Sequence, residues 1–194
     1  MFRFAPVALA AAVIAVPAFA APEKYAPDSS HAQIAFIYNH LGYATGYGMF
    51  SGFAGEMTYN AAEPSTSSAK VSFPVKSMLT RWEARFTHFM SPDFFDATDG
   101  KLVSFTSTTV EVTGDKAGKI NGDLTLNGVT KSFVLDAVLT TEGPYPLPPF
   151  EGKPAIGFNA TTTVLRNDFN HGNFAPFIGD EVQIQMSFEP MKLD

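Results

Sequence analysis

The residues that most often carry chemistry in proteins are sparse in this chain. Cysteine is absent, which excludes a disulfide, a thiolate metal site, a covalent c-type haem and a cysteine nucleophile. The spacings of helical zinc sites, an i, i+4 pair or H-x-x-E-H, do not occur among the histidines, which are His31, His40, His88 and His171. The serines lack a G-x-S-x-G nucleophile elbow.

The carboxylates give no catalytic signature either. Asp93 and Asp96 flank two phenylalanines beside a turn, which is a common loop pattern, and neither Glu56 nor Glu83 has an evident partner carboxylate. We therefore expect no catalytic residue, no metal and no cofactor, and we interpret the protein as a non-enzyme.

His40 is a polar residue within an apolar pattern. It shares the alternation of Phe36 and Tyr38, so its side chain is expected to point toward the same interior. Such a histidine either binds the polar head of a ligand or is satisfied by backbone groups, and the second alternative is the more common.

Arg166 is the second such residue, because it shares the parity of Phe158 and Val164 at the end of a predicted strand. A buried cation needs a partner. Asp96, Asp168 or a ligand oxygen could serve, and a structural ion pair is the favoured interpretation.

The elements that would position these residues are mostly strands. Apolar and polar residues alternate with period two, most clearly in 180–190. The predicted strands are 31–40, 46–59, 67–75, 102–113, 119–126, 129–140, 154–166 and 180–190.

Local signals refine this pattern. Asn127-Gly128 predicts a two-residue hairpin, because a type I′ turn needs positive φ at both positions. The alternation breaks once within 46–59 and once within 102–113, and a one-residue bulge in each would restore one apolar face.

One segment, 81–90, is predicted to be helical. Thr80 and Glu83 have the spacing of a capping box, and Trp82, Phe86 and Phe89 fall on one face. This face would either cover one end of the fold as a lid or plug it.

Eight antiparallel strands can form a sandwich or an up-and-down barrel, and the barrel is favoured because closure removes the sheet edges. The inward-facing residues would then either pack as a solid core or line a cavity. They include Phe36, Tyr38, Phe53, Phe73, Phe105, Leu124, Leu126, Leu135, Phe158, Ile184 and Met186.

The first twenty residues have the features of a secretory signal peptide. Arg3 precedes a short apolar run from Ala5 to Ala15, and Ala18-Phe19-Ala20 is an A-x-A exit. We expect cleavage after Ala20 and one mature domain over 21–194. This domain is expected not to span a membrane, since no later stretch is long and apolar enough.

The charge balance argues against nucleic acid as a partner. The chain has a formal net charge of −6 and contains no basic cluster. Its 19 phenylalanines, three of them within the first twenty residues, must instead fill a large core or line a cavity.

Several motifs, in this order and spacing, resemble the YceI-like family. They are His40-Leu41-Gly42-Tyr43, Phe94-Phe95-Asp96, the hairpin from Gly122 to Lys131, Arg166-Asn167-Asp168-Phe169 and Gly179-Asp180-Glu181-Val182. The resemblance covers about 25–188, nearly all of the mature chain. The helix departs from it, because family members usually have a more polar helix there.

The resemblance implies an all-β, eight-stranded antiparallel lipocalin-like barrel with one short helix. It also implies a periplasmic protein that binds an isoprenoid lipid, such as a quinone or polyprenyl lipid, inside the barrel. We expect a carrier or reservoir that makes transient membrane contact for lipid exchange. The expected ligand-binding residues are Phe36, Tyr38, His40, Phe53, Phe73, Trp82, Phe86, Phe89, Phe105, Leu124, Leu126, Leu135, Phe158, Arg166, Ile184 and Met186.

Alternatives remain at this point. One is an enzyme that acts on such a lipid through His40, and another is a structural or stress-response domain with a filled barrel. Family members are often dimers, so a homodimer is also an expectation from the resemblance.

Overall fold

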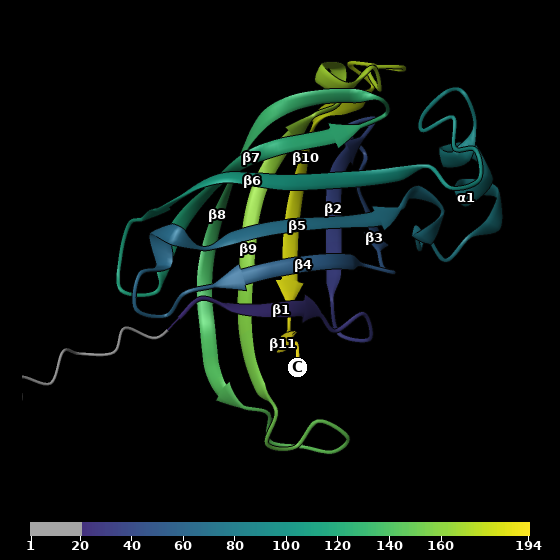
Figure 1. Ribbon diagram of the computed structural model, residues 1–194. Helices are drawn as coiled ribbons and strands as arrows, with labels where there is room; N and C mark the ends of the chain where they lie inside the picture. Colours follow the sequence, from purple (N-terminus) through teal and green to yellow (C-terminus); the bar gives the residue numbers. More distant parts are fainter. Residues whose placement is uncertain (1–20) are drawn as a thin grey trace, which may run out of the picture.

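The computed structural model describes residues 21–194, so the signal peptide expected at 1–20 lies outside the described residues. Within them, eleven strands form one antiparallel sheet. The strands are β1 (Glu23–Pro27), β2 (Gln33–His40), β3 (Ala44–Phe50), β4 (Ala54–Tyr59), β5 (Ser68–Pro74), β6 (Leu102–Val112), β7 (Ala117–Leu126), β8 (Val129–Pro144), β9 (Pro154–Leu165), β10 (Ile178–Phe188) and β11 (Pro190–Lys192). The helix α1 (Glu83–Met90) lies beyond one end of β5 and β6 (Figure 1), and short 3-10 helices occur at η1 (Pro64–Thr66), η2 (Val75–Ser77) and η3 (Arg166–Phe169).

The sheet closes on itself because six of these strands join end to end as three bent ones. β1 continues into β2, β3 into β4, and β10 into β11. β2 pairs with β3 and β10, while β1 pairs with β4 and β11, so each bent strand keeps its neighbours along its length. Because β9 joins both β10 and β11, the result is a closed up-and-down barrel of eight strands in chain order. The predicted fold class is confirmed.

The three bends lie next to one another in the barrel wall. The Asp28 amide donates a hydrogen bond to the Glu189 carbonyl over 3.2 Å, which ties the first bend to the third. The Ser29 hydroxyl donates to the Phe53 carbonyl over 2.7 Å, which ties the first to the second. The wall therefore folds along one line that crosses three adjacent strands.

This line accounts for two differences from the predicted strands. The predicted strand 46–59 is two strands, because Gly52, with φ of +68°, turns the chain between β3 and β4 in place of a one-residue bulge. Strand β1 was not predicted, and among its five residues Tyr25 is the one that is fully buried.

Two other local predictions are confirmed. Asn127 and Gly128 have φ of +52° and +76° and join β7 to β8. The pairing register of β6 and β7 shifts between Ser107 and Thr109, which is the bulge expected within 102–113.

Two glycines in β3 let aromatic rings lie against the backbone. Phe36 pairs with Gly48 and Tyr38 pairs with Gly46 across the β2–β3 ladder. A Cβ atom at Gly48 would lie 2.1 Å from Cζ of Phe36, and one at Gly46 would lie 2.2 Å from Cζ of Tyr38. These positions need glycine because any side chain would displace the rings.

The predicted capping box is wrong. Helix α1 begins after Trp82, which has an extended backbone and makes no side-chain capping bond. Arg81 has φ of +59°, and this turn of the chain keeps Thr80 away from the first helical amides. The Thr80 hydroxyl instead donates to the Trp82 carbonyl over 3.1 Å.

Part of the aromatic content packs solidly at the line of bends. The ring centroids of Phe50 and Phe73 are 4.9 Å apart. The ring centroid of Phe53 lies 5.1 Å from that of Phe73 and 5.1 Å from that of Phe188. All four side chains are buried, and such ring pairs stabilise a core beyond their buried area. They form the aromatic floor of the space described next.

Candidate ligand-binding cavity

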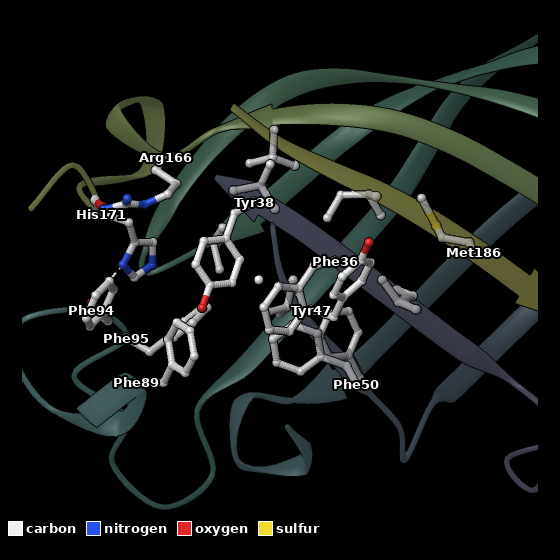
Figure 2. Close-up of a pocket in the computed structure, with 18 of the residues that line it drawn as sticks. Phe36, Tyr38, Tyr47, Phe50, Phe89, Phe94, Phe95, Arg166, His171 and Met186 are labelled. Carbon is white, nitrogen blue, oxygen red and sulfur yellow. Dashed lines mark hydrogen bonds between the residues drawn. The ribbon is translucent and has the colours of Figure 1, made fainter. Parts of the chain in front are cut away.

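The barrel encloses an apolar cavity of about 890 Å³. This is near the upper end of the roughly 300–1,000 Å³ typical of small-molecule sites. Its wall is built from strands β2 to β10 and from α1, and the aromatic floor also faces it. Figure 2 shows aromatic rings from several elements turned toward this space. The interior of the barrel is therefore hollow and is not a solid core.

Fifteen of the sixteen side chains expected at the site line this cavity. They are Phe36, Tyr38, His40, Phe53, Phe73, Trp82, Phe89, Phe105, Leu124, Leu126, Leu135, Phe158, Arg166, Ile184 and Met186. Most lie on strands, where side chains alternate between the two faces of the sheet, so a period-two count placed them on the inner face.

Phe86 is the exception. It is half-buried and packs against the core cluster without lining the cavity. Phe89, one turn on, does line it, with its ring edge-on to Phe36 and Tyr38 at 6.1 Å from each. Helix α1 therefore closes part of the wall through Phe89, while Trp82 at its start is largely exposed.

Sequence reasoning missed a group of lining residues that lie in loops, where no periodicity marks an inner face. Phe94 and Phe95 follow α1, while His171, Phe174 and Phe177 follow η3. The two loops meet: the rings of Phe94 and Phe174 are 5.6 Å apart, and those of Phe95 and His171 are 4.7 Å apart. The signal available was the density of phenylalanine in segments with no strand pattern.

Arg166 has a different partner from the one expected. Its guanidinium donates to the backbone carbonyls of Ile178, Gly179, His171 and Asn173, over 3.1, 3.2, 2.5 and 2.5 Å. The favoured ion pair with Asp96 or Asp168 is wrong, and Asp168 instead pairs with Lys131 at 2.6 Å. Burial lowers the pKa of Arg166. A guanidinium presents five donors, so it satisfies several carbonyls at once and fixes the loop after η3.

His40 lies at the exposed rim of the cavity. Its ring stands edge-on to Tyr38 with centroids 6.5 Å apart. Its side chain makes no hydrogen bond within residues 21–194, so the backbone satisfaction expected for it is not found there.

His171 is buried where the two loops meet. Its Nδ1 lies 2.7 Å from the Phe94 carbonyl oxygen, and a carbonyl can only accept, so Nδ1 carries the proton. Burial lowers the pKa of His171 to about 4, assisted by the charges of Lys101 and Arg166. The ring is therefore neutral near pH 7, with a lone pair on Nε2.

We expect this histidine to make folding acid-sensitive. Its folded-state pKa lies below the unfolded value, so its stabilisation is present above pH 6.5 and is lost as the pH falls through about 4. The loss between pH 7 and pH 4 is about 3 kcal/mol. Urea unfolding at both pH values would measure it, with His171→Asn as the reference. An equal pH effect in both proteins would contradict the assignment.

Within the described part of the chain, no three His, Asp or Glu side chains gather as a metal site would require. His31 forms an exposed pair with Asp28 at 2.7 Å, and His88 forms one with Asp93 at 3.1 Å. No helix within residues 21–194 has the length and apolar character needed to cross a bilayer.

The fold and the cavity can be compared with known proteins. A model of the YceI-like domain matches residues 25–190. A UPF0312 protein of Pseudomonas putida (strain W619) is 38% identical over 167 residues, which are 86% of this chain and 85% of that protein.

Two solved structures share the fold. BcnA of Burkholderia cenocepacia has a TM-score of 0.74 at 18% identity and covers 84% of this chain and 98% of its own. A polyisoprenoid binding domain from Saccharophagus degradans, implicated in plant cell wall breakdown, has a TM-score of 0.66 at 13% identity and covers 87% and 98%. With the match of residues 25–190, the earlier resemblance is confirmed: this chain belongs to the YceI-like family.

Proposed function

We propose that this protein binds an isoprenoid lipid, with the hydrocarbon chain enclosed in the barrel cavity. The observation that carries the proposal is the cavity of about 890 Å³, whose wall is mainly aromatic and aliphatic. Support comes also from the Saccharophagus degradans structure, a polyisoprenoid binding domain with the same fold.

The energetics suit a long hydrocarbon. Each buried methylene contributes about 0.8 kcal/mol, so a chain of some twenty carbons gains on the order of 16 kcal/mol before costs. Ordering the flexible chain offsets much of this gain. Tight binding therefore needs few polar contacts, and chain length and shape would set the preference among lipids.

Direct identification of the ligand tests the proposal. The full-length protein would be expressed, purified without detergent, extracted with organic solvent and examined by mass spectrometry. We expect one isoprenoid lipid in about stoichiometric amount. An empty extract, together with failure to take up added polyprenols and quinones, would contradict the proposal.

We propose further that the protein is secreted and works in the periplasm as a lipid carrier or reservoir. The signal-peptide features of residues 1–20 support this. The intact mass of the purified protein tests the cleavage of the signal peptide, since cleavage after Ala20 leaves a chain that starts at Ala21.

The mouth of the cavity suits contact with a bilayer. We define the mouth as the lining residues that are also exposed and apolar, namely Leu41, Tyr47, Trp82, Phe174 and Phe177. Three of them are more than 60% exposed, and the Arg85 guanidinium lies 5.8 Å from the Trp82 ring centre. Aromatic and arginine side chains favour the interface between lipid and water. We propose that lipid enters here from a membrane surface.

Removing two mouth aromatics should weaken membrane binding. In flotation with vesicles of phosphatidylethanolamine and phosphatidylglycerol, we expect Tyr47→Ser/Phe177→Ser to bind about tenfold more weakly, because two apolar side chains no longer insert. Leu147→Ser is the matched control, since Leu147 is 63% exposed in the β8–β9 loop and does not line the cavity. Equal loss in both variants, or loss in neither, would contradict a role for the mouth.

A further inference from the structure

One part of the cavity wall is a long excursion of the chain between η2 and β6. We call residues 80–98, which contain α1, the lid. They stand beyond the ends of β5 and β6 (Figure 1). Four aromatic side chains of the lid line the cavity, namely Trp82, Phe89, Phe94 and Phe95. The position of the lid therefore decides whether the cavity is closed on this side.

The lid is not hydrogen-bonded to the strand that faces it across the cavity opening. β3 is an edge strand of the sheet, with β2 as its one neighbour among the described strands. The amide and the carbonyl of Met49 both bond to Leu79, just before the lid. Thr45 and Tyr47 alternate with Met49, so their amides and carbonyls point the same way, and within residues 21–194 they make no backbone hydrogen bond on that side. We call this unbonded boundary between β3 and the lid the seam.

On its other side the lid is bound. Within residues 21–194, three residues outside the lid, beyond the bond of its own end to the chain, hold it by hydrogen bonds, namely Lys101, His171 and Asn173. His171 and Asn173 belong to the loop after η3, and they donate to the carbonyls of Phe94 and Asp93 over 2.7 and 2.9 Å. Lys101 directly precedes β6, so its side chain is the link from the lid to the barrel strands.

All three hydrogens of the Lys101 ammonium are used in this link. They are donated to the carbonyls of Phe95 and Asp96, over 2.5 and 3.2 Å, and to Oδ1 of Asn127 over 2.6 Å. Asn127 lies in the β7–β8 turn, and its Nδ2 donates to the carbonyl of Phe169 over 3.3 Å, at the end of η3. Lys101 and Asn127 together therefore join the lid, the barrel and η3.

We propose that residues 80–98 move as a lid over the cavity and that Lys101 and Asn127 form its latch. The proposal rests on the proposed lipid binding and assigns the control of lipid exchange. The lid moves away from β3 at the seam, where no hydrogen bond has to break, once the bonds from Lys101 open. Lys101 and Asn127 are positioning residues, since neither lines the cavity.

A lid has a kinetic signature that a wall contact lacks. Entry and release both require the open state, so weakening the latch raises the two rates by the same factor and leaves the Kd unchanged. Loss of a direct contact with the lipid instead speeds release alone and weakens binding.

Stopped-flow binding of all-trans-retinol, an isoprenoid that fluoresces more strongly in apolar surroundings, tests this signature. Release would be measured by transfer to excess phosphatidylcholine vesicles. We expect Lys101→Met to raise the association and release rates about tenfold each, because three charge-assisted hydrogen bonds are lost. Asn127→Gly should raise both rates about threefold, since it removes two bonds and keeps the turn, which glycine also accepts.

Lys119→Met is the matched control. Lys119 lies on β7, forms an exposed ion pair with Asp136 at 2.7 Å and does not line the cavity. Its two rates should equal those of the wild type.

Amide hydrogen exchange measures the latch without any lipid. In Lys101→Met, the amides of α1 should exchange about tenfold faster than in the wild type, while those of β9 and β10 stay unchanged. In Lys119→Met all of these amides should exchange as in the wild type.

Three results would overturn the latch. The first is wild-type rates in both latch variants, and the second is faster release with an unchanged association rate. The third is unchanged exchange of the α1 amides in Lys101→Met. Failure of retinol to bind the wild type would instead contradict the proposed function, and amide exchange would still decide the latch.

Discussion

Replacing Arg166 with methionine is expected to lower the free energy of unfolding by about 3–5 kcal/mol, because four backbone carbonyls, one buried and three partly buried, lose their charged donor. Arg166 is 8% exposed, and its guanidinium contacts four carbonyls from the loop after η3 and the start of β10. Methionine fills a similar volume but donates no hydrogen bond. Urea unfolding at pH 7 measures the effect.

Arg85→Met is the matched control for stability. Arg85 is exposed on α1, and its described interaction is the contact with Trp82 at 5.8 Å. Its removal should change the free energy of unfolding by less than about 1 kcal/mol. A similarly small change in Arg166→Met would show that the four carbonyls do not depend on the guanidinium.

The Arg166 variant should also alter the cavity. The loop after η3 also carries His171, Phe174 and Phe177, which form one end of the cavity and part of the mouth. If Arg166 holds this loop, lipid binding should weaken in the fraction that remains folded. Arg166 is then a residue that positions the site, and it is not a direct contact for an anionic ligand.

Filling the cavity should remove the ligand. Leu124 on β7 lines the cavity and packs against both the main core cluster and a second cluster around Phe105 and Leu135. The larger Leu124→Trp side chain should extend into the space. We expect the amount of copurified isoprenoid to fall at least about tenfold, while overpacking costs about 1–3 kcal/mol of stability.

The matched control is Leu147→Trp, which introduces the same side chain on the β8–β9 loop outside the cavity. Lipid content per folded protein is the measurement, with far-UV circular dichroism confirming the fold. Unchanged lipid in Leu124→Trp would mean that the ligand is held elsewhere. Equal loss in the control would assign the effect to general destabilisation.

Much of the fold followed from local patterns. The alternation of Val182, Ile184 and Met186 assigns one face of a strand, and an extended chain has no other way to bury these three residues together. Asn127-Gly128 specified a hairpin because both residues accept positive φ. Neither conclusion needs knowledge of distant residues, so each could be drawn from a short window.

The residues that line the candidate cavity also differ in how well the sequence predicts them. Wall residues on strands, such as Phe105 and Leu135, were found by parity. Phe94, Phe174 and His171 were not, because loops have no period and these side chains meet only after β9, β10 and α1 are in place. The partner of Arg166 was misjudged for the same reason, since carbonyls from 171–179 are not visible in a search for acidic residues.

The sequence by itself therefore determined most of the strands, their inward faces and the apolar character of the interior, but not β1 or the break between β3 and β4. Only the tertiary structure decided that the interior is hollow, because a cavity depends on how far apart closure holds the opposite walls. The line of bends packs Phe50, Phe53, Phe73 and Phe188 into a floor and leaves the space beside them open. It also decided the polar chemistry at the end of the cavity, since hydrogen bonds between distant segments depend on distance and direction, which composition does not contain.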